Sequence, residues 1–346
     1  MKIFITGGAG FIGHHLAAKY LEQGHEVYII DNLSTGSINN IDFIYNKCPN
    51  AKQSLFFFKG SVFDYEKMLE LTGICDQVIH LAAAVGVRYI LDNPLESIIT
   101  NVRATENVLE LCSKFKKKVL IASTSEVYGK RNKSDNKALE ENDDCIYGPS
   151  NKSRWSYAAS KLIDEFTARA YYKEKNLQVV TVRFFNTVGP RQTGRYGMVI
   201  PRFVNQALKN EDITVYGDGM QSRTFTHVSE ATNSVIKLME NKKAVGEVIN
   251  IGGMEEITIL DLAKRIKEMV NSKSKIKLIP YEEAYPSDFE DMQRRVPSVK
   301  KLESIINYSP KFNLNGILTD VIESFKEEPI KEKEATKQSQ TQYGVC

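Results

Sequence analysis

The stretch KIFITGGAGFIGHHLA, residues 2–17, decides the fold. It opens with five mostly apolar residues of strand character and then places Gly7, Gly10 and Gly13 at intervals of three, at the start of a helix-period segment. Glycines at this spacing allow a tight turn, close approach of the backbone to a phosphate, and packing of the helix against the strand. The helix N-terminus adds free N–H groups and a positive dipole end. The stretch therefore predicts a strand-turn-helix unit that binds a dinucleotide's pyrophosphate.

The next strand ends in an acidic residue that indicates which dinucleotide binds. Asp31 closes the segment EVYIID, 18 residues after Gly13. A carboxylate at this position accepts hydrogen bonds from the adenosine ribose hydroxyls and repels a 2′-phosphate. Residues 32–36 contain no arginine that could neutralise such a phosphate. We therefore expect NAD rather than NADP.

Apolar, strand-like runs alternate with helix-period segments over the first half of the chain. The runs lie at residues 2–6, 26–30, 55–59, 77–80, 118–122 and 179–183, and helix-period segments lie at residues 13–23, 101–114 and 157–175. Continuous apolar strands that alternate with amphipathic helices indicate a parallel sheet covered on both faces. The expected fold class is α/β, with a Rossmann-type doubly wound sheet.

Composition changes mark the domain organisation. Residues 1–185 are expected to form the NAD-binding domain, with returning segments near 225–252. Residues 186–325 carry shorter elements with Gly-Pro and Gly-Asp-Gly turn signals, and we interpret them as a smaller, interleaved substrate-binding domain. Residues 326–346 are polar and charged, and we expect a flexible tail.

Bulk composition excludes several other classes of function. The chain has 346 residues, and its 46 basic and 43 acidic residues leave a net charge of only +3, which gives no support to nucleic-acid or acidic-membrane binding. No apolar run reaches the ~18 residues of a membrane span. The five cysteines form no CxxC pair, and the five histidines show no ligand spacing, so no metal site is expected. Free thiols and a chain that opens directly into a strand lead us to expect a cytoplasmic protein.

A candidate catalytic group lies in WSYAASK, where Tyr157 and Lys161 are four residues apart and share one face of a helix. A free tyrosine, with a pKa near ~10, is a poor base. A nearby ammonium and the positive nicotinamide ring would stabilise its phenolate form. Tyr157 could then remove a proton from a sugar hydroxyl while a hydride passes to the cofactor. Ser123 to Glu126 follow a buried strand and could supply a hydroxyl that shares this proton.

Taken together, GGAGFIG, the strand end at Asp31, HLAAAVGV, STSEVYG, YAASK and RFFNTVGPR resemble the extended short-chain dehydrogenase/reductase family. Within it, the chain is similar to the NAD-dependent nucleotide-sugar epimerases, dehydratases and decarboxylases, from residue 1 to about residue 325. The resemblance implies a Rossmann domain with a small C-terminal sugar-nucleotide domain. It also implies a chemistry in which NAD transiently oxidises a UDP-sugar at C4.

The resemblance assigns roles residue by residue. The implied catalytic residues are Thr124 or Ser125 as the hydroxyl, Glu126, Tyr157 as the base and Lys161. The implied cofactor-binding residues are Gly7, Gly10, Phe11, Ile12, Gly13, Asp31, Asn32, Ser34, Thr35, Gly36, Ser61, Val62, Leu81, Ala82, Ala83, Asn101, Ser123, Tyr157, Lys161 and Val188. The implied substrate-binding residues are Val85, Asn186, Arg191, Tyr216, Arg223 and Arg295. Ser61 departs from the family, whose members usually have an Asp there that bonds the adenine amine.

The sequence leaves two reactions open. Ser125 stands where the 4,6-dehydratases have an acidic Asp, so elimination of water lacks its usual acid. STSEVYG, the loop GPSNKSRWSYAASK and the segment DMQRRVPSVKK resemble the UDP-glucuronate decarboxylases, which is the first expectation. A 4-keto uronate is a β-keto acid, so the enzyme needs only to orient its carboxylate, with Glu126 and Arg295 nearby. VGVRYILDNPLESIITNV is instead similar to UDP-sugar 4-epimerases acting on UDP-glucose, UDP-glucuronate or UDP-N-acetylglucosamine, which is the alternative.

Two further expectations complete this interpretation. The resemblance implies a homodimer through the helices that contain Asn101 and Tyr157, which would form a four-helix bundle. A non-catalytic NAD-sensing protein on the same fold is a remote alternative, since such proteins usually lose the tyrosine or the lysine, and this chain keeps Tyr157 and Lys161.

Overall fold

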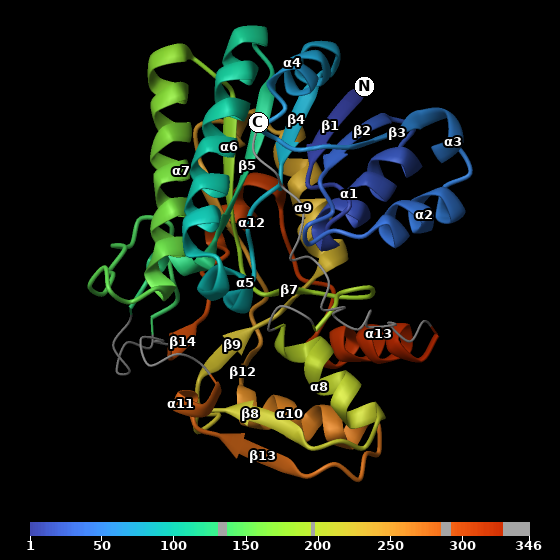
Figure 1. The fold of residues 1–346 in the computed structure, drawn as a ribbon, viewed down its shortest axis with the longest axis vertical. Coiled ribbons are helices and arrows are strands. Elements are labelled where there is room, and N and C mark those ends of the chain that lie inside the picture. Colours follow the sequence, from blue (N-terminus) through green and yellow to red (C-terminus); the bar gives the residue numbers. More distant parts are fainter. Residues whose placement is uncertain (131–136, 195–197, 285–291, 328–346) are drawn as a thin grey trace, which may run out of the picture.

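The computed structural model describes residues 1–130, 137–194, 198–284 and 292–327. Figure 1 shows a large part with a central sheet between two layers of helices, and a smaller part below it that is built from short strands and helices. The predicted tail of residues 326–346 lies outside the described residues from position 328 on.

The central sheet has seven strands, all parallel to their neighbours. Across the sheet they run in the order β11 (Val248–Ile251), β6 (Val179–Phe184), β5 (Lys118–Thr124), β4 (Gln77–His80), β1 (Lys2–Thr6), β2 (Glu26–Asp31) and β3 (Leu55–Lys59). The predicted α/β doubly wound class is confirmed. β2, β5 and β6 continue one or two residues beyond the predicted ends, because the backbones of Asp31, Thr124 and Phe184 still pair within the sheet.

Two apolar layers hold the helices on the sheet. Along β1, Ile3 and Ile5 contribute to one core cluster, whereas Phe4 between them contributes to the cluster on the opposite face. This is the period-two alternation of a strand buried on both sides. One face is covered by α1 (Phe11–Glu22), α2 (Ile38–Lys47) with the short α3 (Ala51–Ser54), α9 (Val228–Glu240) and α12 (Lys300–Ile306). The other is covered by α4 (Tyr65–Ile74), α6 (Pro94–Phe115) and α7 (Arg154–Lys175), with α5 (Val87–Asp92) against the lower ends of α6 and α7.

The helices begin and end where local chemistry sets their limits. α6 has Pro94 at its first position, which suits the fixed φ of proline, and ends at Lys116 in a left-handed conformation. α4 is capped by Asp64, whose carboxylate accepts the N–H of Lys67 at 3.1 Å. The predicted helix at residues 101–114 is thus the second half of a longer one, whose first turn carries the proline signal.

The smaller part has its own apolar cluster, formed mainly by its helices. Its strands are β7 (Thr187–Val188), β8 (Ile213–Tyr216), β9 (Ser222–Thr224), β10 (Thr226–His227), β12 (Glu256–Thr258), β13 (Ile276–Ile279) and β14 (Arg294–Arg295). Its helices are α8 (Val199–Leu208), α10 (Ile259–Met269), α11 (Tyr281–Ala284) and α13 (Leu314–Glu327), and the 3₁₀ turns η1 (Ser125–Tyr128) and η2 (Lys242–Ala244) lie in the larger part. The chain returns to the large sheet through α9, β11 and α12, so the two parts are interleaved.

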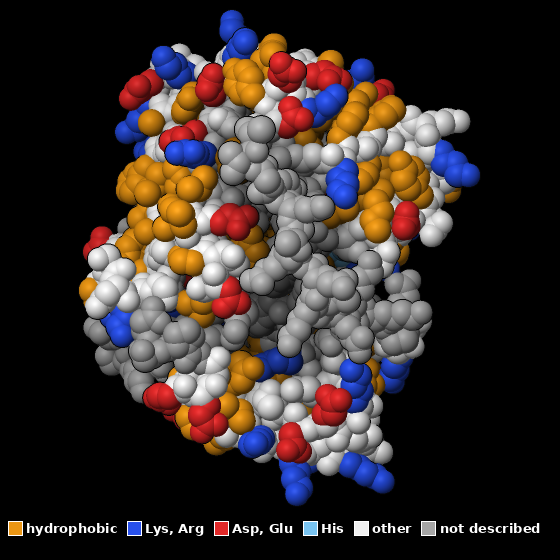
Figure 2. Space-filling view, viewed as in Figure 1, with side chains coloured by type: hydrophobic (Ala, Val, Ile, Leu, Met, Phe, Trp, Pro, Cys, Tyr) orange, Lys and Arg blue, Asp and Glu red, His pale blue; other side chains and the backbone are white. Residues whose placement is uncertain are grey.

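The strand order places a binding crevice beside the first strand. β1 is followed by β2 on one side and by β4 on the other, and ligands of open α/β sheets bind where the strand order reverses in this way. The carboxyl ends of β1, β2, β4 and β5 face the smaller part (Figure 1). The surface in Figure 2 interleaves Lys and Arg with Asp and Glu rather than separating them by sign. In the part of the chain that the structure describes, no helix is both long and apolar enough to span a membrane.

Candidate active site

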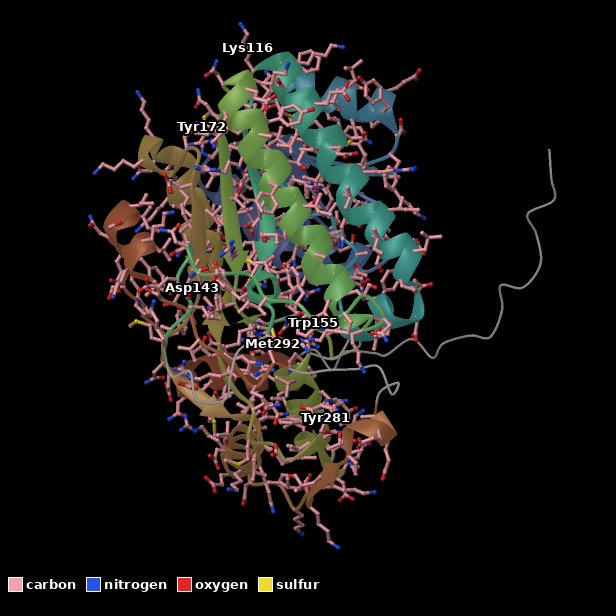
Figure 3. The ribbon with its side chains drawn as sticks, turned by 90° about the vertical axis from the view of Figure 1, so that its left-hand side faces the viewer. Lys116, Asp143, Trp155, Tyr172, Tyr281 and Met292 are labelled. Carbon is pink, nitrogen blue, oxygen red and sulfur yellow. The ribbon has the colours of Figure 1, made fainter. Side chains whose placement is uncertain are left out.

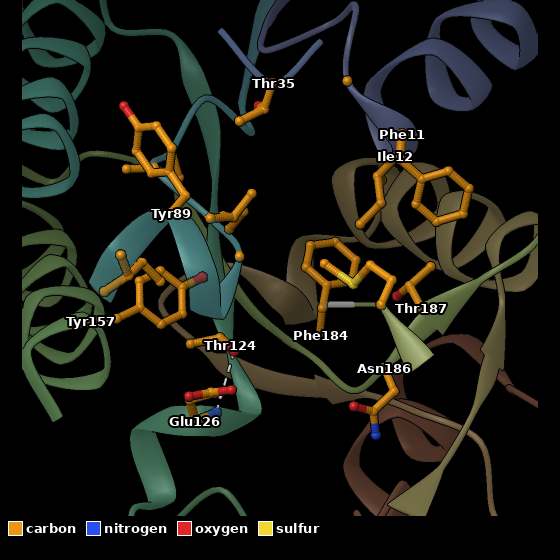
Figure 4. A pocket seen from close by; sticks show the side chains of 18 of the residues that line it. Phe11, Ile12, Thr35, Tyr89, Thr124, Glu126, Tyr157, Phe184, Asn186 and Thr187 are labelled. Atoms are coloured by element: carbon orange, nitrogen blue, oxygen red, sulfur yellow. Dashed lines mark hydrogen bonds between the residues drawn. The ribbon is translucent and has the colours of Figure 1, made fainter. Parts of the chain in front are cut away.

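A cavity of about 540 Å³ lies between the carboxyl ends of the large sheet and the smaller part, which is within the range of ligand-binding pockets (Figure 4). Most of the predicted site residues line this one cavity. They are Gly7, Gly10, Phe11, Ile12, Gly13, Asp31, Asn32, Ser34, Thr35, Val62, Leu81, Ala82, Ala83, Val85, Ser123, Thr124, Ser125, Glu126, Tyr157, Lys161, Asn186, Val188, Tyr216, Arg223 and Arg295. The predicted Gly36, Ser61, Asn101 and Arg191 do not line it.

The glycine turn is as tight as the sequence predicts. Gly7 has a φ of +72°, and a Cβ on it would lie 2.7 Å from the backbone nitrogen of Ala82 at the end of β4. A Cβ on Gly13 would collide with the carbonyl oxygen of Gly7. Gly10, the N-cap residue before α1, has no side chain to cap that helix, so the first N–H groups of α1 are left for an anion in the cavity. The turn fits a pyrophosphate and leaves no space for a larger residue at Gly7 or Gly13.

Asp31 connects the glycine turn with the loop after β2. Its Oδ2 accepts the N–H of Ala9 at 3.0 Å, and its Oδ1 accepts the N–H of Leu33 at 2.8 Å. Burial raises the pKa of Asp31, and these two N–H groups oppose that rise. A Cβ on Gly36 would lie 2.9 Å from Oδ1, so Gly36 gives the carboxylate room from behind rather than lining the cavity. The free lone pairs of the carboxylate suit two ribose hydroxyls.

Two predicted cofactor residues lie behind the cavity wall. The Ser61 hydroxyl accepts the N–H of Phe63 at 3.2 Å and so shapes the turn whose neighbours, Gly60 and Val62, line the cavity. Asn101 is buried on α6, where its Oδ1 accepts the N–H of Ala84 at 2.8 Å. Both side chains therefore hold loops that line the cavity, and neither lines it itself.

The candidate catalytic groups meet at the ends of β5 and α7. Figure 4 shows Tyr157 beside Thr124 and Glu126, and the Thr124 hydroxyl accepts the N–H of Glu126 at 3.2 Å as it caps the 3₁₀ turn η1. The Nζ of Lys161 donates to Asp164 at 2.6 Å. The structure therefore brings these groups to one cavity and adds a partner of Lys161 that the sequence did not indicate.

The pKa of Tyr157 is raised rather than lowered. Burial contributes most, the carboxylates of Glu126 and Asp164 add to the rise, and the Thr124 hydroxyl and Arg295 oppose it. Burial therefore outweighs the groups that stabilise the phenolate of Tyr157, and the ammonium that was expected to do so pairs with Asp164.

Two arginines bracket Glu126. Nη2 of Arg154 and Nη1 of Arg295 both donate to its Oε1, at 3.2 and 3.0 Å. Nη2 of Arg295 also donates to Oδ1 of Asn186 at 3.1 Å, and its Nε is buried without a hydrogen-bond partner among the described residues. Both guanidinium side chains are nearly buried, at 5% and 11% exposure. Two guanidinium groups and one carboxylate therefore lie together at this end of the cavity.

The other end of the cavity is lined by aromatic and further basic side chains. The guanidinium of Arg202 lies over the ring of Tyr216, 4.1 Å from its centroid. Arg223 is buried on β9, and its Nη1 donates to the carbonyl of Ser222 at 2.8 Å. A flat aromatic face with nearby guanidinium groups suits a nucleoside diphosphate.

The structure does not bring Arg191 to the cavity. Its guanidinium lies over the ring of Phe43 at 4.5 Å and donates to the backbone carbonyl of Asn39 at 3.1 Å, so it ties the loop after β7 to α2. RFFNTVGPR gives no sign of this, because the turn at Gly189 and Pro190 decides which way the side chain leaves the loop.

Sequence reasoning missed Arg154 and Arg202. Arg154 lies three residues before Tyr157 and so on the same face of α7, a spacing that could have identified it. Arg202 on α8 left no comparable signal. The described residues contain no cluster of three or more His, Cys, Asp and Glu side chains that could hold a metal ion.

Comparisons with known proteins agree with this geometry. The sequence model of the family described as GDP-mannose 4,6 dehydratase matches residues 4–321. A UDP-N-acetyl-alpha-D-glucosaminuronate decarboxylase of Bacillus cytotoxicus is 41% identical over 94% of this chain and 98% of its own length. The UDP-glucuronic acid decarboxylase 1 of Danio rerio is 33% identical over 94% of this chain and 73% of its own length.

A solved structure has the same fold. The UDP-glucuronic acid 4-epimerase of Bacillus cereus, in complex with UDP-glucuronic acid and NAD, superimposes with a TM-score of 0.83 at 28% identity, covering 94% of this chain and 99% of the epimerase. Both expected reactions, decarboxylation and 4-epimerisation, are therefore represented among proteins similar to this one.

Proposed function

We propose that this chain, which belongs to the GDP-mannose 4,6-dehydratase family and thus to the extended short-chain dehydrogenases/reductases, is an NAD-dependent decarboxylase of UDP-linked uronic acids. The relatives named above support this choice, since the decarboxylases are the more similar in sequence. UDP-glucuronate and its 2-acetamido counterpart are the two substrates to test first. The remote alternative of a non-catalytic NAD sensor is set aside for two reasons. Tyr157, Lys161 and Thr124 line one cavity, and the relatives of this chain are enzymes.

The single observation that supports decarboxylation is the pair of arginines on Glu126. Arg154 and Arg295 contact the same carboxylate oxygen of Glu126, and both guanidinium groups line the cavity with Tyr157. A neutral hexose has no anionic group for them to bind, whereas a uronic acid has its C6 carboxylate. Guanidinium groups match carboxylates in both charge and planar geometry, and the buried Nε of Arg295 is a donor without a partner among the described residues.

The residues present fit NAD. The turn of Gly7, Gly10 and Gly13 has no space for a Cβ at Gly7 or Gly13, and the Asp31 carboxylate is placed for the adenosine ribose. When bound there, NAD would supply a hydride acceptor for C4 of the sugar and a positive ring that opposes the burial-raised pKa of Tyr157.

The chain's own groups then perform the remaining work. Tyr157 takes the proton of the C4 hydroxyl, with Thr124 beside it, which leaves a C4 ketone. Arg295 and Arg154 hold the C6 carboxylate, which is β to that ketone. The C5–C6 bond breaks, carbon dioxide leaves, and the electron pair of the bond enters an enolate whose oxygen is stabilised by the Tyr157 and Thr124 hydroxyls. A proton from solvent at C5 restores the C4 ketone, and return of the hydride to C4 together with the proton held by Tyr157 would give the UDP-pentose.

A second candidate, UDP-sugar 4-epimerisation, is favoured by one observation. The reaction needs only Tyr157, Lys161 and a neighbouring hydroxyl, all of which line the cavity. The purified protein is incubated in parallel with UDP-glucuronate, UDP-2-acetamido-2-deoxyglucuronate, UDP-glucose and UDP-N-acetylglucosamine. NMR of the products then distinguishes decarboxylation from epimerisation. Decarboxylation gives a UDP-pentose only from the acidic sugars. A UDP-sugar that keeps all six sugar carbons and is inverted at C4 would instead identify an epimerase.

We also propose that the protein is a cytoplasmic homodimer. Figure 3 shows α6 and α7 side by side on one face of the molecule, and this face exposes large apolar side chains, among them Leu95 at 70% and Phe166 at 65%. Covering such a face with its copy would form the four-helix bundle. Cys48, Cys75 and Cys112 are buried and free, which suits a reducing compartment. Light scattering of the 39.1 kDa chain tests the assembly, and a monomer at micromolar concentration would refute it.

A further inference from the structure

Asp164 lies beneath the active site, on the side of Lys161 that faces away from the cavity. It follows Lys161 by three residues and Tyr157 by seven, so all three share one face of α7. Lys161 and Tyr157 line the cavity, whereas Asp164 does not. Asp164 is 1% exposed, Lys161 is 2% exposed, and their side chains meet at 2.6 Å. The ion pair is therefore internal, and water does not screen it as it screens a surface pair.

The other neighbours of Asp164 leave Lys161 as its main partner. Oδ1 of Asp164 has no hydrogen-bond partner among the described residues. Burial raises the pKa of Asp164, and the Lys161 ammonium opposes that rise more than the Thr105 hydroxyl on α6 does. The Thr105 hydroxyl also donates to the backbone carbonyl of Asn101 at 3.0 Å. His80 on β4 is fully buried, and burial followed by the charge of Lys161 lowers its pKa to about 3, so it stays neutral. A buried carboxylate with one cationic partner fixes the position of that partner. If the partner moved away, the carboxylate would remain buried with an unpaired charge, which is energetically costly.

The adjacent carboxylate, Glu165, has a different role. It accepts Nη2 of Arg183 at 2.7 Å and the Ser123 hydroxyl at 2.5 Å, so it ties α7 to β6 and β5. Asp164 raises the pKa of Tyr157, after burial and Glu126. Of these two consecutive acidic residues, Asp164 pairs with Lys161 and Glu165 pairs with Arg183.

We propose that Asp164 is a positioning residue for the active-site lysine: its carboxylate fixes the Lys161 ammonium under the cavity floor and offsets part of the positive charge that acts on the Tyr157 hydroxyl. The charged groups around that hydroxyl then include the Asp164–Lys161 pair and Glu126, which Arg154 and Arg295 both contact. The inference depends on the proposed function only in taking Tyr157 as the group that loses a proton. It holds equally for decarboxylation and epimerisation.

Asp164→Asn tests the proposal, because it removes the charge and keeps the shape. Without Asp164 the charge of Lys161 acts on Tyr157 in full, so we expect the acid limb of the kcat–pH profile to move to lower pH by about half a unit to one unit. The KM for the UDP-sugar should stay within about twofold, since Asp164 does not line the cavity, while kcat at its optimum falls because the ammonium is less fixed. Asp164→Glu, which keeps the charge at the same helix position, should restore the limb.

Glu165→Gln is the matched control, because it removes a buried carboxylate one residue away. It should lower the melting temperature without moving the acid limb. Asp164→Ser replaces Asp164→Asn if the latter does not fold. An acid limb at the wild-type pH in the folded Asp164 variants would overturn the proposal, as would an equal shift in Glu165→Gln.

A direct titration separates this inference from the proposed function. The near-ultraviolet absorbance of tyrosinate is followed in NAD-loaded wild type and Asp164→Asn, each compared with the same protein carrying Tyr157→Phe. The difference isolates the ionisation of Tyr157 and requires no turnover. We expect its midpoint to fall in Asp164→Asn even if the enzyme acts on none of the sugars tested, whereas identical midpoints would refute the role of Asp164.

Discussion

Asp31→Asn perturbs the residue that links the glycine turn to the choice of cofactor. The carboxylate accepts the N–H groups of Ala9 at 3.0 Å and Leu33 at 2.8 Å. An asparagine keeps one acceptor oxygen and turns an NH₂ group toward the other N–H donor, so one charge-assisted bond is lost. Such a bond contributes about 1.5–3 kcal/mol. We expect the protein without cofactor to lose stability by that amount in urea unfolding.

The same change weakens NAD binding separately. A carboxylate accepts both adenosine ribose hydroxyls, whereas the amide oxygen accepts one, so the loss is again about 1.5–3 kcal/mol, or about 10- to 150-fold in Kd. NADP should gain relative to NAD, because the repulsion of a 2′-phosphate disappears. Isothermal titration of the cofactor-free protein with NAD and with NADP measures both effects.

Asp64→Asn provides the control for lost charge. Asp64 caps α4 near the same edge of the sheet, and asparagine caps a helix as well as aspartate does. Stability and NAD affinity should both stay unchanged. If Asp31→Asn is destabilised as expected but binds NAD within threefold of wild type, Asp31 only supports the loop, and the reasoning about the cofactor is wrong.

Three other predictions address the site and its support. Tyr157→Phe should lower kcat by about 10²- to 10⁴-fold while NAD remains bound, because only the hydroxyl is lost; a stopped assay with a parallel cofactor measurement checks this. Arg191→Ala should leave the KM of the UDP-sugar within twofold and cost about 0.5–1 kcal/mol of stability through the lost contact with Phe43, measured by steady-state kinetics and urea unfolding. His15→Gln should protect against acid: burial lowers the pKa of His15 from 6.5 to about 4, so the unfolded chain takes up its proton first, and stability falls by up to about 3 kcal/mol as the pH drops from 6.5 to 4. Glutamine removes that loss and can still donate to the carbonyl of Pro190, and urea unfolding at several pH values measures the difference.

The sequence predicted those features that depend on local pattern. Gly7 and Gly13 sit where a Cβ has no space, and the strand ending at Asp31 is paired as expected, because period and turn chemistry act over a few residues. The gathering of Thr124 and Tyr157 was also predictable, since Thr124 ends a parallel strand and Tyr157 lies in the first turn of the helix that follows it.

Features that depend on the direction of a single side chain were not predictable. Asp164 and Lys161 have the spacing of an ordinary surface ion pair on a helix, and only the packing of α6 on α7 makes the pair internal. Arg191 was assigned to the substrate, but its loop turns it onto Phe43. Arg154 is three residues from Tyr157, yet its place in the site depends on its ion pair with Glu126, which lies on a different element.

The fate of C6 of the substrate tests the central claim most directly. UDP-glucuronate and UDP-2-acetamido-2-deoxyglucuronate labelled with ¹³C at C6 are each incubated with the purified, NAD-loaded protein, and the label is followed by NMR. We predict that the label leaves one of these sugars as bicarbonate while an unlabelled UDP-pentose accumulates. A label that stays in a UDP-hexuronate, now inverted at C4, would contradict decarboxylation and identify an epimerase.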